Sequence, residues 1–274
     1  MVAAAEWPGL ERQLDAQAET LAAIIYEPVL QAAGGMRIIS PDLLPRLRRW
    51  ADAHGVLLIA DEVASGMGRC GAMLASHLAT TGRPDDRTTG RPSGMPDLAI
   101  VSKGLTGGSL PLACVLTTQP MYDAFLGSWV SRRAFLHSNT YAGNALAVAA
   151  ADAVLRVMRD EGVCAQAVAS GTRMRTALAA RAHPRLSAVR SLGMVAAVDL
   201  LGCDPAARTG FRVYQEAVRR GALLRPLGDT LYLFPPLNAP WGEIEAMIGV
   251  LCDSVDAVCR GTAGFSPRNG VDAG

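Results

Sequence analysis

The sequence predicts an α/β protein with a mostly parallel sheet, and two observations lead to this fold class. Short apolar runs such as Val56–Ala60 and Leu98–Val101 have the length and composition of strands buried on both faces. Longer segments with helical periodicity separate these runs along the chain. Strands that alternate with helices in this way usually pair in parallel, because a parallel connection needs a crossover that a helix can provide.

The first half of the chain is expected to contain two helices and four strands. The strands are the apolar runs Leu21–Tyr26, Val56–Ala60, Leu98–Val101 and Leu112–Thr117. One helix is expected over Glu11–Thr20. The other follows Ser40, a typical N-cap, and Pro41, which suits the first helical position. This second helix should end at Gly55, because glycine commonly stops a helix.

The second half is expected to form a smaller α/β unit. Helical patterns cover Asn144–Arg159, Val163–Arg181, Gly210–Arg220 and Trp241–Arg260. Strand candidates are Gly193–Leu200, Ala222–Leu224 and Thr230–Phe234. We therefore expect part of a large domain over residues 1–150 and a small C-terminal domain over residues 151–274. The sequence TTGRP occurs at residues 80–84 and again at 88–92, which predicts a surface loop insertion over about residues 80–95.

Composition excludes several classes of protein. The 26 basic residues are nearly balanced by 25 acidic ones, so the net charge of +1 does not suit electrostatic binding of nucleic acid or of a membrane surface. No apolar run has the length of a membrane-spanning helix, and residues 1–20 lack the pattern of a secretory signal. The six cysteines contain no C-x-x-C pair, and the four histidines lack metal-ligand spacing. A cytoplasmic protein with free thiols and no metal is expected.

The basic residues are very unequally divided. Of the 26, one is a lysine, Lys103, and the remaining 25 are arginines. Arginine cannot replace lysine where a neutral amine must act as a nucleophile. Lys103 is therefore either a required nucleophile or a chance remnant of an arginine-rich composition. Chance is the simpler interpretation, and the residues around Lys103 have to decide between these alternatives.

Two polar residues lie at the ends of apolar runs: Asp61 comes directly after Val56–Ala60, and Lys103 comes two residues after Leu98–Val101. In open α/β sheets ligands bind at the carboxyl ends of the strands. Taken singly, each residue is most simply a turn residue or a solvated side chain. As a pair they offer a carboxylate for a pyridinium nitrogen and an amine for an imine, which pyridoxal phosphate chemistry requires. The glycines after Lys103 would let the backbone approach such a cofactor closely.

The segment His137–Asn144 precedes a long helical pattern and is rich in hydroxyl and amide side chains. Such residues before a helix are most often caps. The alternative is that Thr140 and nearby N–H groups meet a phosphate at the start of the helix. From spacing alone the cap is favoured.

Four segments together resemble a known family. They are Glu27–Gln31 (EPVLQ), Leu58–Arg69 (LIADEVASGMGR), Ser102–Gly108 (SKGLTGG) and Thr140–Asn144 (TYAGN). In this order and approximate spacing, the chain resembles the class III aminotransferases from about residue 7 to about residue 255. The resemblance implies the fold of the pyridoxal-phosphate-dependent transferases of fold type I, with pyridoxal 5'-phosphate as cofactor. It also implies a homodimer whose active sites are shared between subunits.

The resemblance also implies roles for individual residues. Lys103 would hold the cofactor through an imine and later carry the proton that moves during transamination. Asp61 would pair with the protonated ring nitrogen, and Val63 would pack on one face of the ring. Asn139 and Thr140 would reach the phosphate of the cofactor in the partner subunit.

Within the class, the chain is most similar to the branch that serves biotin biosynthesis by moving an amino group from S-adenosylmethionine to 8-amino-7-oxononanoate. Ala64 stands where other branches usually have Gln, and Leu-Arg-Pro at 224–226 is typical of this branch. By this resemblance Arg225 would receive the substrate carboxylate as a bidentate pair, and Ser138 and Tyr232 would also contact substrate.

The chain also departs from the family pattern. The family's chain begins well upstream, so an N-terminal part with the phosphate cradle of the cofactor domain is expected to be missing here. Cys70, Met67 and Leu237 stand where Thr, Phe and Tyr are usual. Two alternatives therefore stand beside the biotin-pathway reading: another class III ω-aminotransferase, and an inactive truncated fragment.

Overall fold

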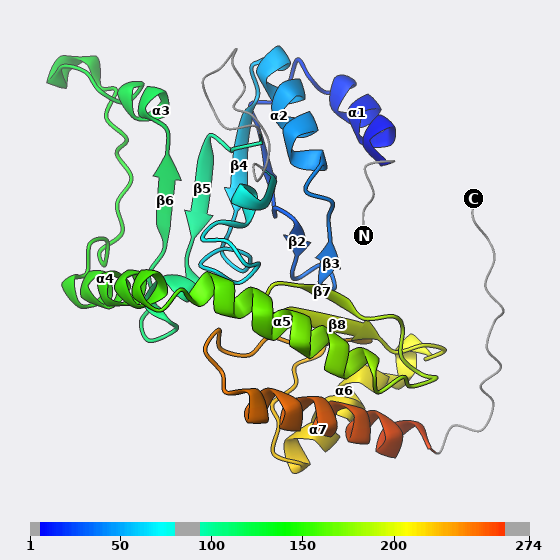
Figure 1. Ribbon diagram of the computed structural model, residues 1–274. Helices are drawn as coiled ribbons and strands as arrows, with labels where there is room; N and C mark the ends of the chain where they lie inside the picture. Colours follow the sequence, from blue (N-terminus) through cyan, green and yellow to red (C-terminus); the bar gives the residue numbers. More distant parts are fainter. Residues whose placement is uncertain (1–5, 80–93, 261–274) are drawn as a thin grey trace. The chain divides into compact units, whose positions relative to one another are not determined.

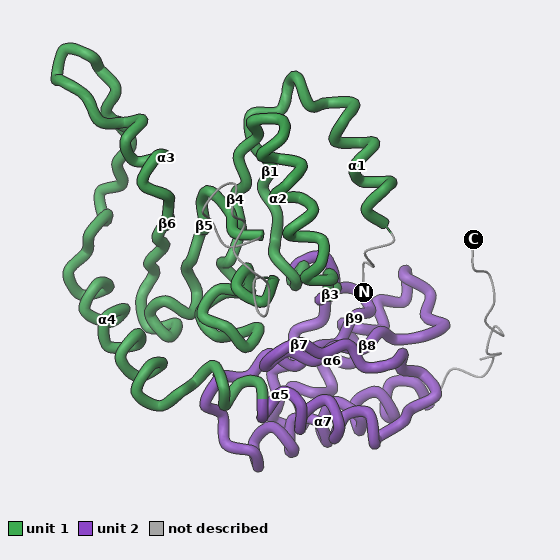
Figure 2. Tube along the Cα trace, turned by 45° about the horizontal axis from the view of Figure 1, so that its top comes forward, with its two compact units in different colours: residues 1–32, 37–168 green, residues 33–36, 169–274 purple. Residues whose placement is uncertain are grey.

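The computed structural model describes residues 6–79 and 94–260, so most of the expected insertion at about residues 80–95 lies outside the described residues. The chain divides into two compact units, which are coloured separately in Figure 2. Unit 1 contains residues 1–32 and 37–168. Unit 2 contains residues 33–36 and 169–274.

Unit 1 is built on a four-stranded sheet in the order β1-β4-β5-β6 (Figure 1). Its strands are β1 (Ala23–Tyr26), β4 (Leu57–Asp61), β5 (Leu98–Val101) and β6 (Cys114–Thr117). The first three pair in parallel, whereas β6 is antiparallel to β5. The prediction of a mostly parallel sheet is therefore confirmed.

Helices α1 (Trp7–Asp15) and α2 (Leu43–His54) cover one face of this sheet. Their contact face forms a core with the strands, and the buried members are Trp7, Leu43, Leu47, Trp50, Ala51, Val56 and Leu58. The indole of Trp50 also donates to the Asp15 carboxylate at 2.7 Å, which joins the ends of the two helices. A salt bridge of 2.7 Å between Arg48 and the buried Asp97 attaches α2 to the segment that leads into β5.

The expected bounds of both helices were partly wrong. The first helix begins at Trp7 instead of Glu11, because the buried indole of Trp7 anchors its first turn. It ends at Asp15 instead of Thr20. The second begins at Leu43 with Asp42 at the N-cap position, so Ser40 is not the cap. The glycine stop is confirmed, since Gly55 adopts a φ of 66° and its N–H donates to the carbonyl of Ala51.

The opposite face of the sheet is left largely open by the described residues. Side chains alternate along each strand, so Ile25 and Ile59 point away from α1 and α2. Ile25 is 62% exposed, and Val115 on β6 is 57% exposed. An apolar sheet face of this kind is expected to be covered in the working protein.

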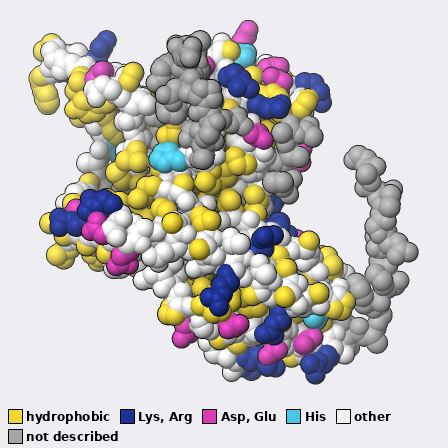
Figure 3. All heavy atoms as spheres, in the orientation of Figure 1, with side chains coloured by type: hydrophobic (Ala, Val, Ile, Leu, Met, Phe, Trp, Pro, Cys, Tyr) yellow, Lys and Arg dark blue, Asp and Glu magenta, His cyan; other side chains and the backbone are white. Residues whose placement is uncertain are grey.

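An arm follows β6 and contains α3 (Gln119–Asp123) and the short helix η4 (Trp129–Ser131). Apolar side chains gather on it (Figure 3), and its exposed large members are Tyr122, Phe125, Leu126, Trp129, Val130, Phe135 and Leu136. The chain then enters α4 (Ala145–Asp160), which was expected over Asn144–Arg159.

The hairpin of β2 (Leu30–Gln31) and β3 (Arg37–Ile38) was not predicted, because each strand has only two residues. Residues 33–36 at its tip belong to unit 2. The hairpin therefore contributes backbone to both units.

Unit 2 holds a three-stranded antiparallel sheet in the order β7-β8-β9. Its strands are β7 (Arg190–Leu192), β8 (Val195–Asp199) and β9 (Thr230–Leu233). The helices are α5 (Val163–Ala179), which begins in unit 1, η5 (Pro205–Ala207), α6 (Thr209–Arg219) and α7 (Trp241–Cys259). Four consecutive residues of β8 are buried, which means that both faces of this sheet are covered. Across the described residues, no helix is long and apolar enough to cross a membrane.

One predicted strand of unit 2 is absent and another was missed. Ala222–Leu224 is not a strand, because the N–H of Ala222 donates to Ala217 at the end of α6 and Pro226 follows closely. β7 was not expected, because its three residues show no clear alternation of apolar and polar side chains. β7 forms because it pairs with β8, and its own sequence pattern does not indicate a strand.

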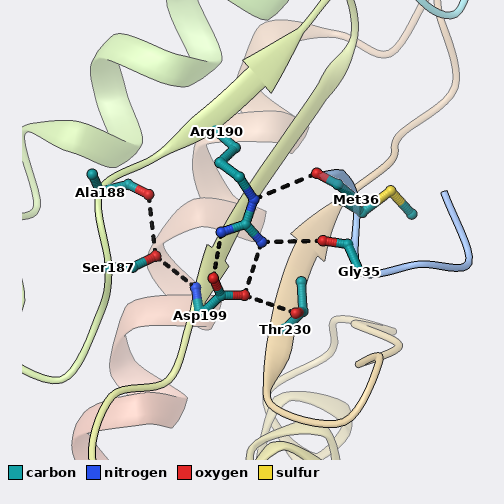
Figure 4. A network of polar contacts seen from close by, with 7 residues as sticks. All are labelled: Gly35, Met36, Ser187, Ala188, Arg190, Asp199 and Thr230. Atoms are coloured by element: carbon teal, nitrogen blue, oxygen red, sulfur yellow. Dashed lines mark hydrogen bonds and ion pairs between the residues drawn. The ribbon is translucent and has the colours of Figure 1, made fainter. Parts of the chain in front are cut away.

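A polar network centred on Arg190 organises unit 2 (Figure 4). The guanidinium forms a bidentate pair with Asp199 and donates to the carbonyls of Gly35 and Met36 at the hairpin tip. Thr230 donates to the same carboxylate at 2.7 Å. Strands β7, β8 and β9 and the hairpin tip are thus joined through one ion pair.

The ion pair predicts how the stability of unit 2 depends on pH. The hydrogen bonds from Arg190 hold the pKa of Asp199 below its ordinary value of 3.8. As pH falls, Asp199 takes up a proton in the unfolded chain before it does so in the folded chain. The ion pair therefore stabilises the fold above about pH 4, and this stabilisation is lost as pH falls through the folded pKa of Asp199. Asp199→Asn should lower the free energy of urea unfolding at pH 7 by about 1 kcal/mol, a value discounted because the Asp199 side chain is 39% exposed.

Urea unfolding followed by circular dichroism at several pH values measures both effects. Asp152→Asn is the matched control, since it removes an ion pair with Arg156 in which both side chains are mostly exposed. The control should leave the unfolding free energy nearly unchanged. An equal loss in both variants, or the same pH dependence in Asp199→Asn as in the wild-type chain, would contradict the prediction.

Candidate active site

Three charged residues lie at the carboxyl ends of the three parallel strands of unit 1. Glu27 comes after β1, Asp61 is the last residue of β4, and Lys103 begins the short helix η3 (Lys103–Thr106) after β5. Tyr26 is paired with Ala60, so continuing the register by one residue places Glu27 beside Asp61 on the same face of the sheet. The structure therefore brings Asp61 and Lys103 to one edge, as the sequence predicted, and adds Glu27.

The electrostatics of Glu27 support this arrangement. Burial raises the pKa of Glu27 above its ordinary value, and the N–H of Ala32, which donates to the carboxylate at 3.1 Å, lowers it. The Asp61 charge raises the same pKa, whereas the Lys103 ammonium lowers it. The three charges thus act on one another across the edge of the sheet.

The side chains of Asp61 and Lys103 are accessible and can contact a bound group. The Asp61 side chain is half-buried, and its Oδ1 accepts the N–H of Val63 at 3.0 Å. Lys103 is exposed, and its amine makes no hydrogen bond or ion pair with another described residue. An amine and a carboxylate at one sheet edge can hold a ligand that carries both an aldehyde and a basic ring nitrogen.

The backbone around Lys103 is fixed by short contacts. Ser102 donates to the carbonyl of Leu112 at 2.8 Å, and Thr106 donates to Leu110 at 2.6 Å. Gly107 and Gly108 follow with φ values of 61° and 82°, which glycine adopts without strain. The Leu-Thr-Gly-Gly sequence after the lysine thus forms a turn that returns the chain to β6.

Residues 62–76, called here the Glu62 loop, follow Asp61 and include the first two residues of the short helix η2 (Ala75–Ala79). The carboxylate of Glu62 is 1% exposed and accepts four hydrogen bonds. Its donors are the Ser65 hydroxyl, the Ala75 N–H, and the N–H and hydroxyl of Ser76. No role was expected for Glu62 from the sequence, since an acidic residue after a strand gives no sign of burial.

The segment expected to reach a phosphate leads into α4. Asn144 caps α4 by accepting from Leu146 and Ala147, so the cap expected in this segment is present at its last residue. Ser138, Asn139 and Thr140 lie upstream and are exposed. The Asn139 side chain accepts the N–H of Tyr141, and no described hydrogen bond joins these three residues to Asp61 or Lys103.

The two expected substrate residues of unit 2 lie in different settings. Arg225 is exposed in the coil after α6 and forms no ion pair with another described residue. Tyr232 is half-buried in β9, with its ring edge-on to Phe234 at a centroid distance of 6.4 Å. Arg225 is thus available for a carboxylate.

Comparison with known proteins identifies the family. The family model described as aminotransferase class III matches residues 4–255. The chain belongs to the class III aminotransferases. The resemblance seen in the motifs around Asp61 and Lys103 is therefore confirmed over nearly the whole chain.

Relatives named for different activities match this class III chain. It is 36% identical, over 91% of its length, to the adenosylmethionine-8-amino-7-oxononanoate aminotransferase of Nitratidesulfovibrio vulgaris. It is also 32% identical, over 88% of its length, to the 5-aminovalerate aminotransferase DavT of Pseudomonas aeruginosa. Among solved structures it is similar to an amine transaminase from an uncultivated Pseudomonas species in its PLP-bound (internal aldimine) form, with a TM-score of 0.80 and 34% identity over 92% of this chain.

This class III chain spans about half the length of the proteins it matches. It covers 45% of the Nitratidesulfovibrio enzyme, 54% of DavT and 56% of the amine transaminase chain. About half of the length of each of these proteins therefore lies outside the match with this chain.

The closed Glu62 loop leads us to expect that Cys70 and Cys114 differ strongly in their reactivity toward a thiol reagent. Burial raises the pKa of the Cys70 thiol to about 12, and the nearby Glu62 charge adds to the rise. Because the thiolate is the reactive form, a thiol reagent at pH 8 should label exposed Cys114 and leave Cys70 unmodified in the native chain.

Peptide mass spectrometry after a timed labelling reaction measures this contrast. Cys114→Ser serves as the control, because it should abolish the fast label without exposing Cys70. Both thiols should react at similar rates in denaturant. Rapid modification of Cys70 in the native chain would show that the Glu62 loop is not closed as described.

Proposed function

We propose that this chain carries the lysine-bearing part of a pyridoxal-phosphate-dependent aminotransferase. The observation that supports this most directly is the placement of Asp61 and Lys103 at one edge of the parallel sheet, with no ion pair to Lys103 from the described part of the chain. Pyridoxal 5'-phosphate, when bound, supplies an electron sink that eases loss of the proton from the amino-bearing carbon of a substrate. The remaining chemistry falls to residues of the chain.

In this proposal Lys103 acts twice. Its neutral amine binds the cofactor aldehyde, and once released it takes a proton from one carbon and returns it to another. Asp61 keeps the ring nitrogen protonated, and its Oδ1 is held in place by the Val63 N–H. Glu27 adds negative charge beside Asp61. Val63 contributes an apolar contact against the ring.

The assembly is also part of the proposal. We expect a homodimer in which Asn139 and Thr140 serve the cofactor phosphate of the partner, because both are exposed on an arm rich in apolar side chains. Residues 1–150 would belong to the cofactor-binding domain and residues 151–274 to the smaller domain. None of the six cysteines, all of which lie in the described ranges, forms a disulfide, and this suits a cytoplasmic location.

The substrate pair proposed is S-adenosylmethionine as amino donor and 8-amino-7-oxononanoate as acceptor, in biotin biosynthesis. Ala64 and the Leu-Arg-Pro sequence around Arg225 support this choice, as does the likeness to the Nitratidesulfovibrio enzyme. Arg225 would bind the acceptor carboxylate, with Ser138 and Tyr232 as further contacts. The likeness to DavT supports a second candidate, a class III ω-aminotransferase with another substrate.

The first test asks whether Lys103 binds the cofactor. Incubation of the full chain with saturating pyridoxal phosphate, followed by borohydride, should leave a phosphopyridoxyl group on the peptide that contains Lys103. Lys103→Arg is the matched control, because it keeps the charge but offers no neutral amine. Absence of the adduct in the wild-type chain would overturn the proposed activity for this chain and favour the inactive fragment, while family membership would stand.

The second test separates the two candidate substrates. Product analysis with S-adenosylmethionine and 8-amino-7-oxononanoate should yield the diamine, and Arg225→Gln should lower kcat/KM for this acceptor by roughly tenfold or more. Arg219→Gln, an exposed arginine of the same unit, should leave kcat/KM unchanged. Turnover of 5-aminovalerate in place of S-adenosylmethionine would instead establish the second candidate.

A further inference from the structure

The Glu62 loop is attached at one end to Asp61 and is held closed by a single buried carboxylate. We propose that Glu62 is a positioning residue for Lys103, acting through this loop on the backbone next to the lysine. The proposal deepens the proposed function and rests on it. It assigns to Glu62 a role in holding the nucleophile in place for the cofactor, without contact between Glu62 and the reacting atoms.

The first step is the closure of the loop. Both oxygens of Glu62 are used: Oε2 accepts from Ala75 N–H at 2.8 Å and from Ser65 at 3.2 Å, and Oε1 accepts from Ser76 N–H at 2.8 Å and its hydroxyl at 2.6 Å. Two of these donors are the first N–H groups of η2, which would otherwise be unpaired in a buried place. The carboxylate therefore fixes the far end of the loop to the end of β4.

The second step is the tight packing inside the loop. A Cβ at Gly66 would lie 2.8 Å from the carbonyl oxygen of Glu62, so the chain passes against Glu62 without room for a side chain. Met67 follows with a φ of 53°, a left-handed conformation that a non-glycine residue keeps only when its surroundings hold it. The position of Met67 is thus set by the closed loop.

The third step connects Met67 to the lysine. A Cβ at Gly104 would lie 2.6 Å from the Cβ of Met67, so the residue after Lys103 packs directly on the loop. The N–H of Leu105 donates to Ser102 and the N–H of Gly107 to Gly104, which forms η3 against this contact. If the loop opens, Met67 moves away and the turn that carries Lys103 loses its support.

Glutamine cannot replace Glu62 in this arrangement. Each carboxylate oxygen accepts at least one backbone N–H, and both N–H groups are buried. The amide of Gln has one acceptor oxygen, and its NH₂ group would face an N–H donor. Glu62→Gln should therefore open the loop while changing the shape of the side chain very little.

A good control exists in the same unit. Asp97 is another buried carboxylate, 6% exposed, and it accepts the N–H of Leu58 and pairs with Arg48 at the opposite end of the sheet. Asp97→Asn removes the negative charge that pairs with Arg48 and should destabilise unit 1 without touching the Glu62 loop. The comparison separates positioning of Lys103 from a general loss of stability.

The experiment measures three properties of the full-length wild-type, Glu62→Gln and Asp97→Asn chains. They are the labelling rate of Cys70, the hydrogen exchange of the peptide that contains Lys103 and Leu105, and the initial rate at which borohydride fixes pyridoxal phosphate on Lys103. In Glu62→Gln the first two should rise by roughly tenfold and the third should fall by roughly tenfold. In Asp97→Asn all three should stay near wild type at a temperature where both variants are folded.

A compensating pair of substitutions tests the contact between Met67 and Gly104. Gly104→Ala alone should slow cofactor attachment, because its Cβ has no space. In Met67→Gly/Gly104→Ala the opposing Cβ is gone and glycine accepts the left-handed φ, so attachment should recover at least in part.

The outcomes distinguish the two proposals. Normal exchange around Lys103 in Glu62→Gln, or an equal change in Asp97→Asn, would overturn the positioning role even if the wild-type chain binds the cofactor. Increased exchange in Glu62→Gln alone would support the positioning role even if no variant, including wild type, forms an adduct, and that result would overturn only the proposed activity.

Discussion

The parallel pairing of β1, β4 and β5 is the constraint on which the candidate site depends. A shift of one residue in this pairing would turn Asp61 to the opposite face of the sheet, because side chains alternate along a strand. The register instead places Glu27 beside Asp61, and β5 delivers Lys103 to the same edge. Backbone hydrogen bonds between apolar strands thus bring together charged groups that are 34 and 42 positions apart in the sequence.

Two separate sets of contacts hold the backbone around Lys103. Hydroxyl groups of Ser102 and Thr106 fix the turn on the side of β6. On the other side the Glu62 loop packs against Gly104 so closely that no side chain fits between them. Exposed groups at an active site are commonly held by buried neighbours in this way, because burial makes hydrogen bonds hard to exchange with water.

Unit 1 also shows what a class III aminotransferase chain of this length leaves uncovered. Ile25 and Val115 are exposed on the open face of the sheet, and Trp129 on the arm is 92% exposed. Relatives of about twice this length share the fold of the part present here.

Much of this could be read from the sequence, because it depends on local pattern. Continuous apolar runs identified β1, β4, β5 and β6, and the lone lysine in Ser-Lys-Gly-Leu-Thr-Gly-Gly was part of the motif set that indicated the family. The antiparallel direction of β6, the three-residue β7 and the absence of a strand at Ala222–Leu224 were decided by pairing with distant segments. The positions of Glu27 and Glu62 were likewise decided by contacts with segments distant in the sequence. Whether an acidic residue after a strand stays in water or becomes a buried acceptor depends on which donors the fold brings to it, and no sequence neighbour of Glu62 reveals that Ala75 and Ser76 do so.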